Sequence, residues 1–360
     1  MRFPEFSGEW EIHRLGELVE IKSGVSPTGI IDENGLFPFY KVEQLNNCYV
    51  ELNETPYLTM QSSVPVHSII FPKRGAAIMT NKIRIASKPC QLDTNLMALI
   101  IENNEKVDYK FLFYFIARYN LSKIADTSTI PQINNIHINP LKITLPSIKE
   151  QQKISALLTV LDLKIDTQRK IIEKYESLIR GLYHSVFNQP ASTLQLKDVV
   201  SVVKGQQVNG EELLEYGKYY VMNGGTEPSG YLDVCNTPAN TISISEGGNS
   251  CGYVQYNTKP FWSGGHCYSL IQKEQSVNYQ YLYHFLKYKE RNIMALRIGS
   301  GLPNVQKKDL ERFEIRVLPT KQQNRVAEIL ADVSAKCDLE KRILQGWQCQ
   351  KSYLLHNLFI

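Results

Sequence analysis

One stretch of this sequence occurs twice, first as ITLPSIKEQQKISALLTVLDLKIDTQRKIIEKYESLIRGLYHSVF at residues 143–187 and again as IRVLPTKQQNRVAEILADVSAKCDLEKRILQGWQCQKSYLLHNLF at residues 315–359. In this alignment Gln151 meets Gln323 and Phe187 meets Phe359. The two copies lie much further apart than the about 20 to 50 residues of a solenoid repeat. The pattern therefore predicts a whole domain with a long helix, copied once.

Both copies carry a heptad pattern, in which the seam residues follow one another at alternating steps of four and three. Each copy predicts a helix of about 38 residues, roughly 57 Å long, and a helix of that length needs a partner. The simplest partner is the other copy. The seam positions include Ile154, Leu158, Leu161, Ile165, Gln168 and Ile172 in the first copy and Val326, Leu330, Val333, Cys337, Glu340, Leu344 and Trp347 in the second. Further along the seam, Lys351 of the second copy is aligned with Ile179 of the first.

The sequence alone allows the two helices to pair in parallel or antiparallel, because a folded domain separates them in the chain. We favour an antiparallel coiled coil, since only that arrangement puts two similar globular halves at opposite ends of a rod with pseudo-two-fold symmetry. Gln168 and Glu340 would then lie near the middle, where a polar residue can fix the register. The alternative is that one or both side chains point into solvent.

The segments between the helices change to short, β-like pieces separated by Gly, Pro and Asn. Short helices are expected at residues 15–21 and 109–119, with counterparts at 196–202 and 279–288. The predicted fold is α+β, with two similar α/β domains separated by two long α-helices. The expected boundaries are 1–145 for the first globular domain, 146–188 for the first helix, 189–318 for the second domain and 319–360 for the second helix.

Composition restricts the possible classes of protein. The chain has 360 residues, 43% hydrophobic and 21% charged, with a net charge of +4, which is too small to indicate a polyanion partner by itself. The seven cysteines include no C-x-x-C pair, which disfavours a disulfide framework and a structural zinc site. No apolar run is long enough for a membrane span, and no signal peptide is evident, so we expect a cytoplasmic protein.

Polar loops of the globular halves are candidate contacts with DNA, because Arg and Lys reach phosphate or guanine, Asn and Gln pair with adenine, and a carboxylate accepts from cytosine. The first half has the basic turn FPKRGA, whereas its counterpart SEGGNSCG has no basic residue. Both could equally be ordinary hairpin turns. The candidate residues are Lys41, Lys73, Arg74, Asn81, Lys82, Arg84, Gln132, Asn134 and His137 in the first half and Asn223, Gly224, Glu246, Asn249, Ser250, Asn304 and Lys307 in the second.

Several catalytic motifs are missing from the sequence. It has no P-loop, no G-x-G-x-x-G after a strand, no H-E-x-x-H and no G-x-S-x-G. It also lacks the Asn-Pro-Pro-aromatic and Asp-Pro-Pro-aromatic tetrapeptides of amino-methyltransferases. These absences favour a non-catalytic chain with no catalytic residues and no metal of its own.

Three motifs then give a family resemblance: W-E-x-x-x-L-G-E at residues 10–17, I-I-F-P-K-R-G-A at 69–76 and L-P-x-x-x-E-Q-x-x-I at 145–154, all before a heptad helix. Their order and duplication resemble the specificity (S) subunit of type I restriction-modification systems. The segment TKPFWSGGHCYSL at residues 258–270 is also similar to a target recognition domain of that family.

The resemblance implies that each target recognition domain reads one part of a bipartite DNA site and that the helices set the spacer and dock methyltransferase (M) subunits, typically two. An endonuclease (R) subunit would join them. The assembled complex would be an adenine-specific DNA methyltransferase and endonuclease, whose partner subunits use S-adenosylmethionine, ATP and Mg, with no cofactor on this chain. Two other classes are a two-headed coiled-coil scaffold for protein partners and an autonomous methyltransferase or nuclease.

Overall fold

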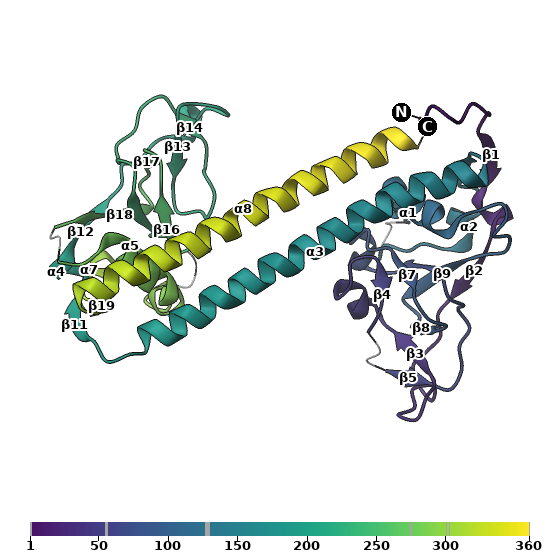
Figure 1. Ribbon diagram of the computed structural model, residues 1–360, viewed down its shortest axis with the longest axis horizontal. Helices are drawn as coiled ribbons and strands as arrows, with labels where there is room; N and C mark the ends of the chain where they lie inside the picture. Colours follow the sequence, from purple (N-terminus) through teal and green to yellow (C-terminus); the bar gives the residue numbers. More distant parts are fainter. Residues whose placement is uncertain are drawn as a thin grey trace. The chain divides into compact units, whose positions relative to one another are not determined.

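The computed structural model describes residues 2–54, 57–126, 130–273, 276–299, 301 and 303–359 (Figure 1). The chain forms two compact units, unit 1 with Met1–Lys170 and Arg342–Ile360, and unit 2 with Ile171–Lys341. Two long helices, α3 (Ile148–Phe187) and α8 (Thr320–Leu358), each contribute one portion to each unit. We call the remainder of each unit its lobe.

The lobe of unit 1 is built on a mixed five-stranded sheet. Its strand order is β2-β9-β6-β7-β4, where β4 and β7 are parallel and the other neighbours antiparallel. A three-stranded sheet, β5-β3-β8, and a β1-β10 pair complete it. The strands are β1 (Glu11–Arg14), β2 (Val19–Ser23), β3 (Phe37–Tyr40), β4 (Glu51–Leu52), β5 (Leu58–Thr59), β6 (Ile69–Pro72), β7 (Arg84–Ala86), β8 (Gln91–Leu92), β9 (Leu96–Ile101) and β10 (Lys142–Leu145).

The helices of this lobe are short except for one. Helix α1 (Tyr109–Tyr119) is capped by Asp108, whose carboxylate accepts the N–H of Phe111 at 2.8 Å. The core of unit 1 joins α1 to the main sheet, to the start of α3 and to the end of α8. The remaining pieces are α2 (Asn135–Ile138) and the 3₁₀ turns η1 (Leu15–Glu17), η2 (Val42–Asn46), η3 (Ala76–Thr80) and η4 (Leu121–Ile124).

The lobe of unit 2 repeats this plan. Its main sheet is antiparallel, in the order β12-β18-β15-β16, and a smaller sheet β14-β13-β17 and a β11-β19 pair accompany it. The strands are β11 (Ser192–Gln195), β12 (Val200–Lys204), β13 (Tyr219–Met222), β14 (Tyr231–Leu232), β15 (Thr241–Ser245), β16 (Val254–Asn257), β17 (Trp262–Ser263), β18 (Cys267–Gln272) and β19 (Glu314–Val317). The helices are α4 (Leu196–Val199), η5 (Gly210–Glu212), α5 (Tyr279–Tyr288), α6 (Glu290–Met294) and α7 (Lys307–Glu311).

For two of the four short helices expected from the sequence, the predicted extent is wrong, because the observed helical turns are shorter. Helices α1 and α5 occur at residues 109–119 and 279–288, but residues 15–21 form only a 3₁₀ turn before strand β2, and residues 196–202 form one helical turn before β12. The reason is tertiary pairing: β2 and β12 each bond to a long buried strand, β9 or β18, and residues such as Val19 and Val200 fit a strand well.

Segments of α3 and α8 run antiparallel within each unit. In unit 1, Asp162 of α3 bonds to Lys351 of α8, while Lys164, further along α3, lies over the ring of Trp347, which comes earlier in α8. In unit 2, Glu176 pairs with Lys341 at 2.9 Å, and Leu182 shares a core with Leu330. As residue numbers rise along α3 they fall along α8, which is the direction favoured from the sequence.

The heptad seam is more deeply buried on α3 than on α8. The six α3 seam positions from Ile154 to Ile172 are buried, including Gln168, so this side chain does not point into solvent. On α8, Leu330 and Cys337 are buried, whereas Val326, Val333, Glu340, Leu344 and Trp347 are half-buried. Helix α8 therefore presents the more open and more polar seam.

Candidate nucleic-acid interface

In unit 2, the polar strips predicted from the sequence lie side by side at one end of the main sheet. The N–H of Glu246, just after β15, donates to the carbonyl of His266, just before β18, at 2.8 Å. The N–H of Val305 donates to the Glu246 carbonyl at 2.8 Å, and the N–H of His266 donates to Oδ1 of Asn223 at 3.0 Å. We define the second reading edge as Asn223, Gly224, Glu246, His266 and Asn304.

The Glu246 carboxylate is the most constrained group of this edge. Its Oε1 accepts from the Lys204 ammonium at 2.7 Å and from the Tyr268 hydroxyl at 2.9 Å. Its buried Oε2 has no hydrogen bond within the described part of the chain and lies 3.8 Å from Nδ1 of His266. One oxygen is therefore held in place while the other keeps its capacity to accept.

Three predicted residues of the second half lie beside this edge. Asn249 is exposed and Ser250 is half-buried in the turn between β15 and β16. Lys307 is exposed at the start of α7 and lies 3.7 Å from Glu311. Ser300 and Leu302, in the strip that precedes α7, lie outside the described residues.

In unit 1, the corresponding strips meet at the same place. The N–H of Ile133 donates to the carbonyl of Lys73 at 2.8 Å, and Arg74 and Gln132 form an isolated β-bridge. The Gln132 amide donates to Asn134, whose own N–H donates to Nδ1 of His137 at 3.1 Å. We define the first reading edge as Lys73, Arg74, Gln132, Asn134 and His137. Residues 127–129, which open the predicted strip, lie outside the described residues.

The other candidate side chains of the first half make contacts elsewhere in the lobe. The Asn81 amide donates to a carbonyl at the end of α1 at 2.8 Å, and the Arg84 guanidinium donates to a carbonyl of η2 at 2.6 Å. Lys82 bonds to a side chain of η2, and the Lys41 ammonium lies 3.9 Å from the centre of the Tyr57 ring. The structure does not bring these four side chains into the first reading edge.

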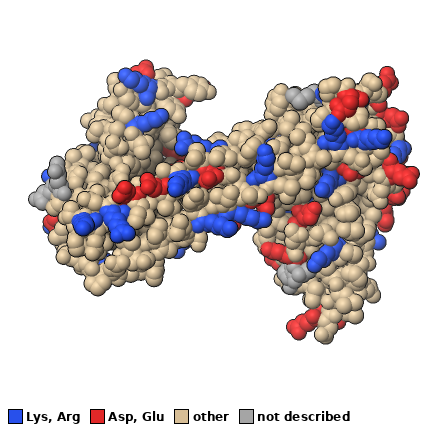
Figure 2. All heavy atoms as spheres, viewed as in Figure 1, with Lys and Arg blue, Asp and Glu red and all other residues tan. Residues whose placement is uncertain are grey.

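The two edges carry opposite charges at equivalent backbone positions. Lys73 and Glu246 each follow the central strand of their lobe, and each carbonyl receives an N–H from the strip before the last short helix. Burial, and then the charge of Arg74, lower the pKa of Lys73. On the face drawn in Figure 2, both signs of charge are interspersed over each unit. The edges thus share a scaffold and differ in chemistry.

A buried glutamine fixes each lobe to the first turns of a long helix. Oε1 of Gln151 on α3 accepts the N–H of Asp108, the residue that caps α1, at 3.0 Å. Oε1 of Gln323 on α8 accepts the N–H of Asn278, which caps α5, at 2.8 Å. Both glutamines are 1% exposed, which gives the repeated glutamine of the sequence a structural reason.

A second attachment, in unit 1, is ionic. Oδ1 of Asp162 on α3 accepts from the Lys351 ammonium of α8 at 2.5 Å, and its Oδ2 accepts from the Tyr114 hydroxyl of α1 at 2.6 Å. Burial, and then the charge of Asp162, raise the pKa of Tyr114, which keeps this hydroxyl protonated. We call Tyr114, Asp162 and Lys351 the ionic joint.

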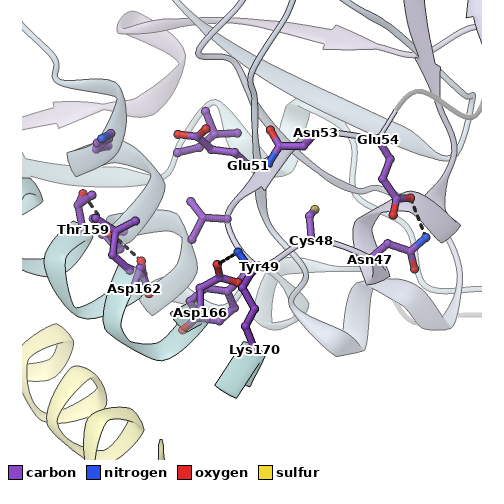
Figure 3. A pocket seen from close by; sticks show the side chains of 15 residues that line it. Asn47, Cys48, Tyr49, Glu51, Asn53, Glu54, Thr159, Asp162, Asp166 and Lys170 are labelled. Atoms are coloured by element: carbon purple, nitrogen blue, oxygen red, sulfur yellow. Dashed lines mark hydrogen bonds and ion pairs between the residues drawn. The ribbon is translucent and has the colours of Figure 1, made fainter. Parts of the chain in front are cut away.

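A hollow of about 350 Å³ lies beside the ionic joint, between α3 and the loop that leads into β4. Figure 3 shows Glu51 and Asn53 of the lobe on one side of it and Thr159 and Asp162 of α3 on another. Tyr49, from the same loop, also lines it. The lobe and α3 are therefore not in continuous apolar contact here.

The equivalent attachment in unit 2 is aromatic and uncharged. His284 of α5 aligns in sequence with Tyr114 of α1, and its Nδ1 lies 3.0 Å from the Tyr183 hydroxyl of α3. Burial lowers the pKa of His284 to about 4, so the ring is neutral. Phe187 packs against the rings of Tyr183 and Phe285. We call Tyr183, His284 and Phe187 the aromatic joint.

Sequence reasoning missed His266 and the ionic joint. His266 gave little signal, since one histidine in a glycine-rich turn is common. Lys351 did give a signal, because it occupies a seam position where the first copy has Ile179. Among the described residues, no cluster of three or more His, Cys, Asp or Glu could hold a metal ion, and no helix is long and apolar enough to cross a membrane.

Comparisons with known proteins bear on the family and the fold of the chain. Residues 7–177 and 189–346 match the family described as type I restriction modification DNA specificity domain. The type I restriction enzyme MjaVIII specificity subunit of Methanocaldococcus jannaschii is 21% identical over 414 residues, covering 99% of this chain and 93% of that protein. The crystal structure of a type I restriction-modification S subunit from M. genitalium, 19% identical, covers 100% of this chain and 99% of its own, with a TM-score of 0.77.

Proposed function

The chain belongs to the family of type I restriction modification DNA specificity domains, and from this premise we propose that each lobe reads one part of a bipartite double-stranded DNA site. The observation that carries the proposal is the pair of reading edges. They occupy the same position on a repeated scaffold, yet Lys73 of one corresponds to Glu246 of the other. Two edges of unlike charge suit two unlike half-sites.

The recognition domains are proposed to be residues 1–145 and 189–318, and α3 and α8 are proposed to set the unread spacer. On the first edge, cationic and amide side chains would position the DNA backbone and read base edges. On the second edge, amide side chains and the neighbouring Lys307 would do so, and Glu246 would accept from a cytosine amino group. The predicted residues outside the edges, such as Lys41 and Lys82, would at most support the loops that make contact.

The proposed partners are methyltransferase subunits, two per chain, and an endonuclease subunit. A candidate contact on the helices is the open hollow of about 330 Å³ in unit 1, lined by Val160, Leu163 and Trp347 among others. Val160 and Leu163 are 51% and 62% exposed, which is high for large apolar side chains. In this proposal the partners bring S-adenosylmethionine, ATP and Mg together with the chemistry, and this chain selects the DNA.

Co-expression of the chain with the methyltransferase subunit of its system, followed by sequencing that maps methylated bases, tests the proposal. We expect one bipartite motif with a fixed gap. Methylation of a single continuous motif, or of DNA regardless of sequence, would contradict it.

The protein-scaffold alternative is not favoured, because the matched family is a DNA specificity domain. It would predict no salt-dependent DNA binding by the assembled complex. Phosphate contacts instead make the affinity for DNA fall as the salt concentration rises.

A further inference from the structure

Lys351 is unusual because an ammonium group occupies a seam position of a helix pair. The same position of the first copy holds Ile179. Removing a charge from water is costly unless a partner of good geometry is present, so a lysine at such a position restricts which partner segment it can face. Its side chain is 17% exposed, and that of its partner Asp162 is 5% exposed.

Asp162 connects three elements of unit 1. Its two carboxylate oxygens accept from Lys351 of α8 and from Tyr114 of α1, while Asp162 itself belongs to α3. Tyr49 of the lobe extends the contact, because Lys351 lies 3.4 Å from its hydroxyl and the Arg169 guanidinium lies 4.3 Å from the centre of its ring. The position of α8 along α3 and the position of the lobe thus depend on the same carboxylate.

Apolar packing between the lobe and α3 is interrupted at this point. The hollow of about 350 Å³ separates the loop around Tyr49 from α3. If α8 moved by one turn, Trp347 or Leu355 would face Asp162, and this carboxylate would keep only the Tyr114 hydroxyl as a partner. The ionic joint therefore adds to the apolar seam a contact that favours the observed register over its neighbours.

From these contacts we propose that the Asp162–Lys351 pair fixes the register of α3 against α8 in unit 1 and so determines the DNA spacer that the chain accepts. The inference rests on the proposed function. A slip of one helical turn moves α8 by about 5.4 Å, and DNA rises about 3.4 Å per base pair, so one turn corresponds to one or two base pairs of spacer. Asp162 and Lys351 are positioning residues, which act on the spacer through the helices.

The test uses the complex of the full chain with its methyltransferase subunits and DNA whose spacer is shortened or lengthened by one or two base pairs. In the double variant Asp162→Asn/Lys351→Met, both side chains keep their approximate size and no charge is left unpaired. We expect this complex to assemble, and its preference for the natural spacer over the altered spacers to fall by about tenfold. Base preference within each half-site should not change.

The control is Lys341→Met, which removes the exposed pair with Glu176 in unit 2 and should leave the spacer preference unaltered. The single variant Lys351→Met should broaden the preference as well. The inference is overturned if the double variant keeps the wild-type preference for the natural spacer. It is also overturned if the variant methylates DNA more slowly by the same factor at every spacer length. If the wild-type complex instead recognises no bipartite site, the proposed function is wrong, and the inference that rests on it is wrong as well.

Discussion

Each of the two joints attaches a lobe to a long helix, with different chemistry. In unit 1 a carboxylate, an ammonium and a phenol join α1 to both long helices, and in unit 2 a phenol, a neutral imidazole and packed rings join α5 to α3. At the aligned positions Tyr114 and His284, the duplicated scaffold has therefore exchanged an ionic contact for a neutral one. The ionic joint is directional and specifies register, whereas the aromatic joint depends mainly on burial.

The largest expected difference follows from removing one charge. Lys351→Met leaves the Asp162 carboxylate buried with only the Tyr114 hydroxyl, and we expect the free energy of unfolding to fall by about 3 kcal/mol. Lys341→Met breaks a pair whose side chains are 50% and 40% exposed, and should cost less than about 1 kcal/mol. Urea unfolding of both variants measures the contrast. Equal costs would contradict a special role for the ionic joint.

Acid should weaken the aromatic joint through His284. The pKa of His284 is about 4 in the folded chain, below its ordinary value near 6.5, so protons bind preferentially to the unfolded chain between these values. This contribution to stability is complete above about pH 6.5 and is lost as the pH falls towards 4, by up to about 3 kcal/mol. Urea unfolding across this range should give a shallower pH dependence for His284→Gln. An unchanged slope would exclude His284 as the cause.

Removing a single hydroxyl compares the two joints more finely. Tyr183→Phe leaves Nδ1 of the buried His284 without its partner, and we expect a loss of about 1 to 2 kcal/mol in the free energy of unfolding. Tyr114→Phe removes one of two donors to Asp162, while Lys351 remains. The decisive measurement is the pKa of His284 by NMR. The pKa of His284 should rise in Tyr183→Phe, because the ring is then less shielded from water, and should stay near 4 in Tyr114→Phe.

The smallest expected effect concerns helix α8, whose seam is the more open. Gly346 lies inside this helix, and an added Cβ would meet nothing within 4 Å. Gly346→Ala should therefore raise the free energy of unfolding by about 1 kcal/mol. Gly29 also has open space but a φ of 76°, so Gly29→Ala should destabilise instead. Thermal melting of the two variants should give shifts of opposite sign.

Periodicity predicted the long helices, because the seam must be buried over many turns. The repeat predicted the duplicated α/β plan, and a symmetry argument favoured the antiparallel direction. Local pattern failed at residues 15–21, where pairing with β9 overrides the short-range helical signal. The sequence located the turns with Lys73 and Glu246. It could not show that Arg84 and Asn81 are used to bond backbone carbonyls, since those partners lie far away in the chain. DNA contact by the candidate residues stays a prediction.

The independence of the two reading edges is tested most directly by exchanging residues 1–145 for the corresponding domain of another family member and mapping methylated sites by sequencing. The account predicts that one half of the bipartite motif changes, while the other half and the spacer remain. A change in both halves, or in neither, would contradict two lobes that read DNA separately.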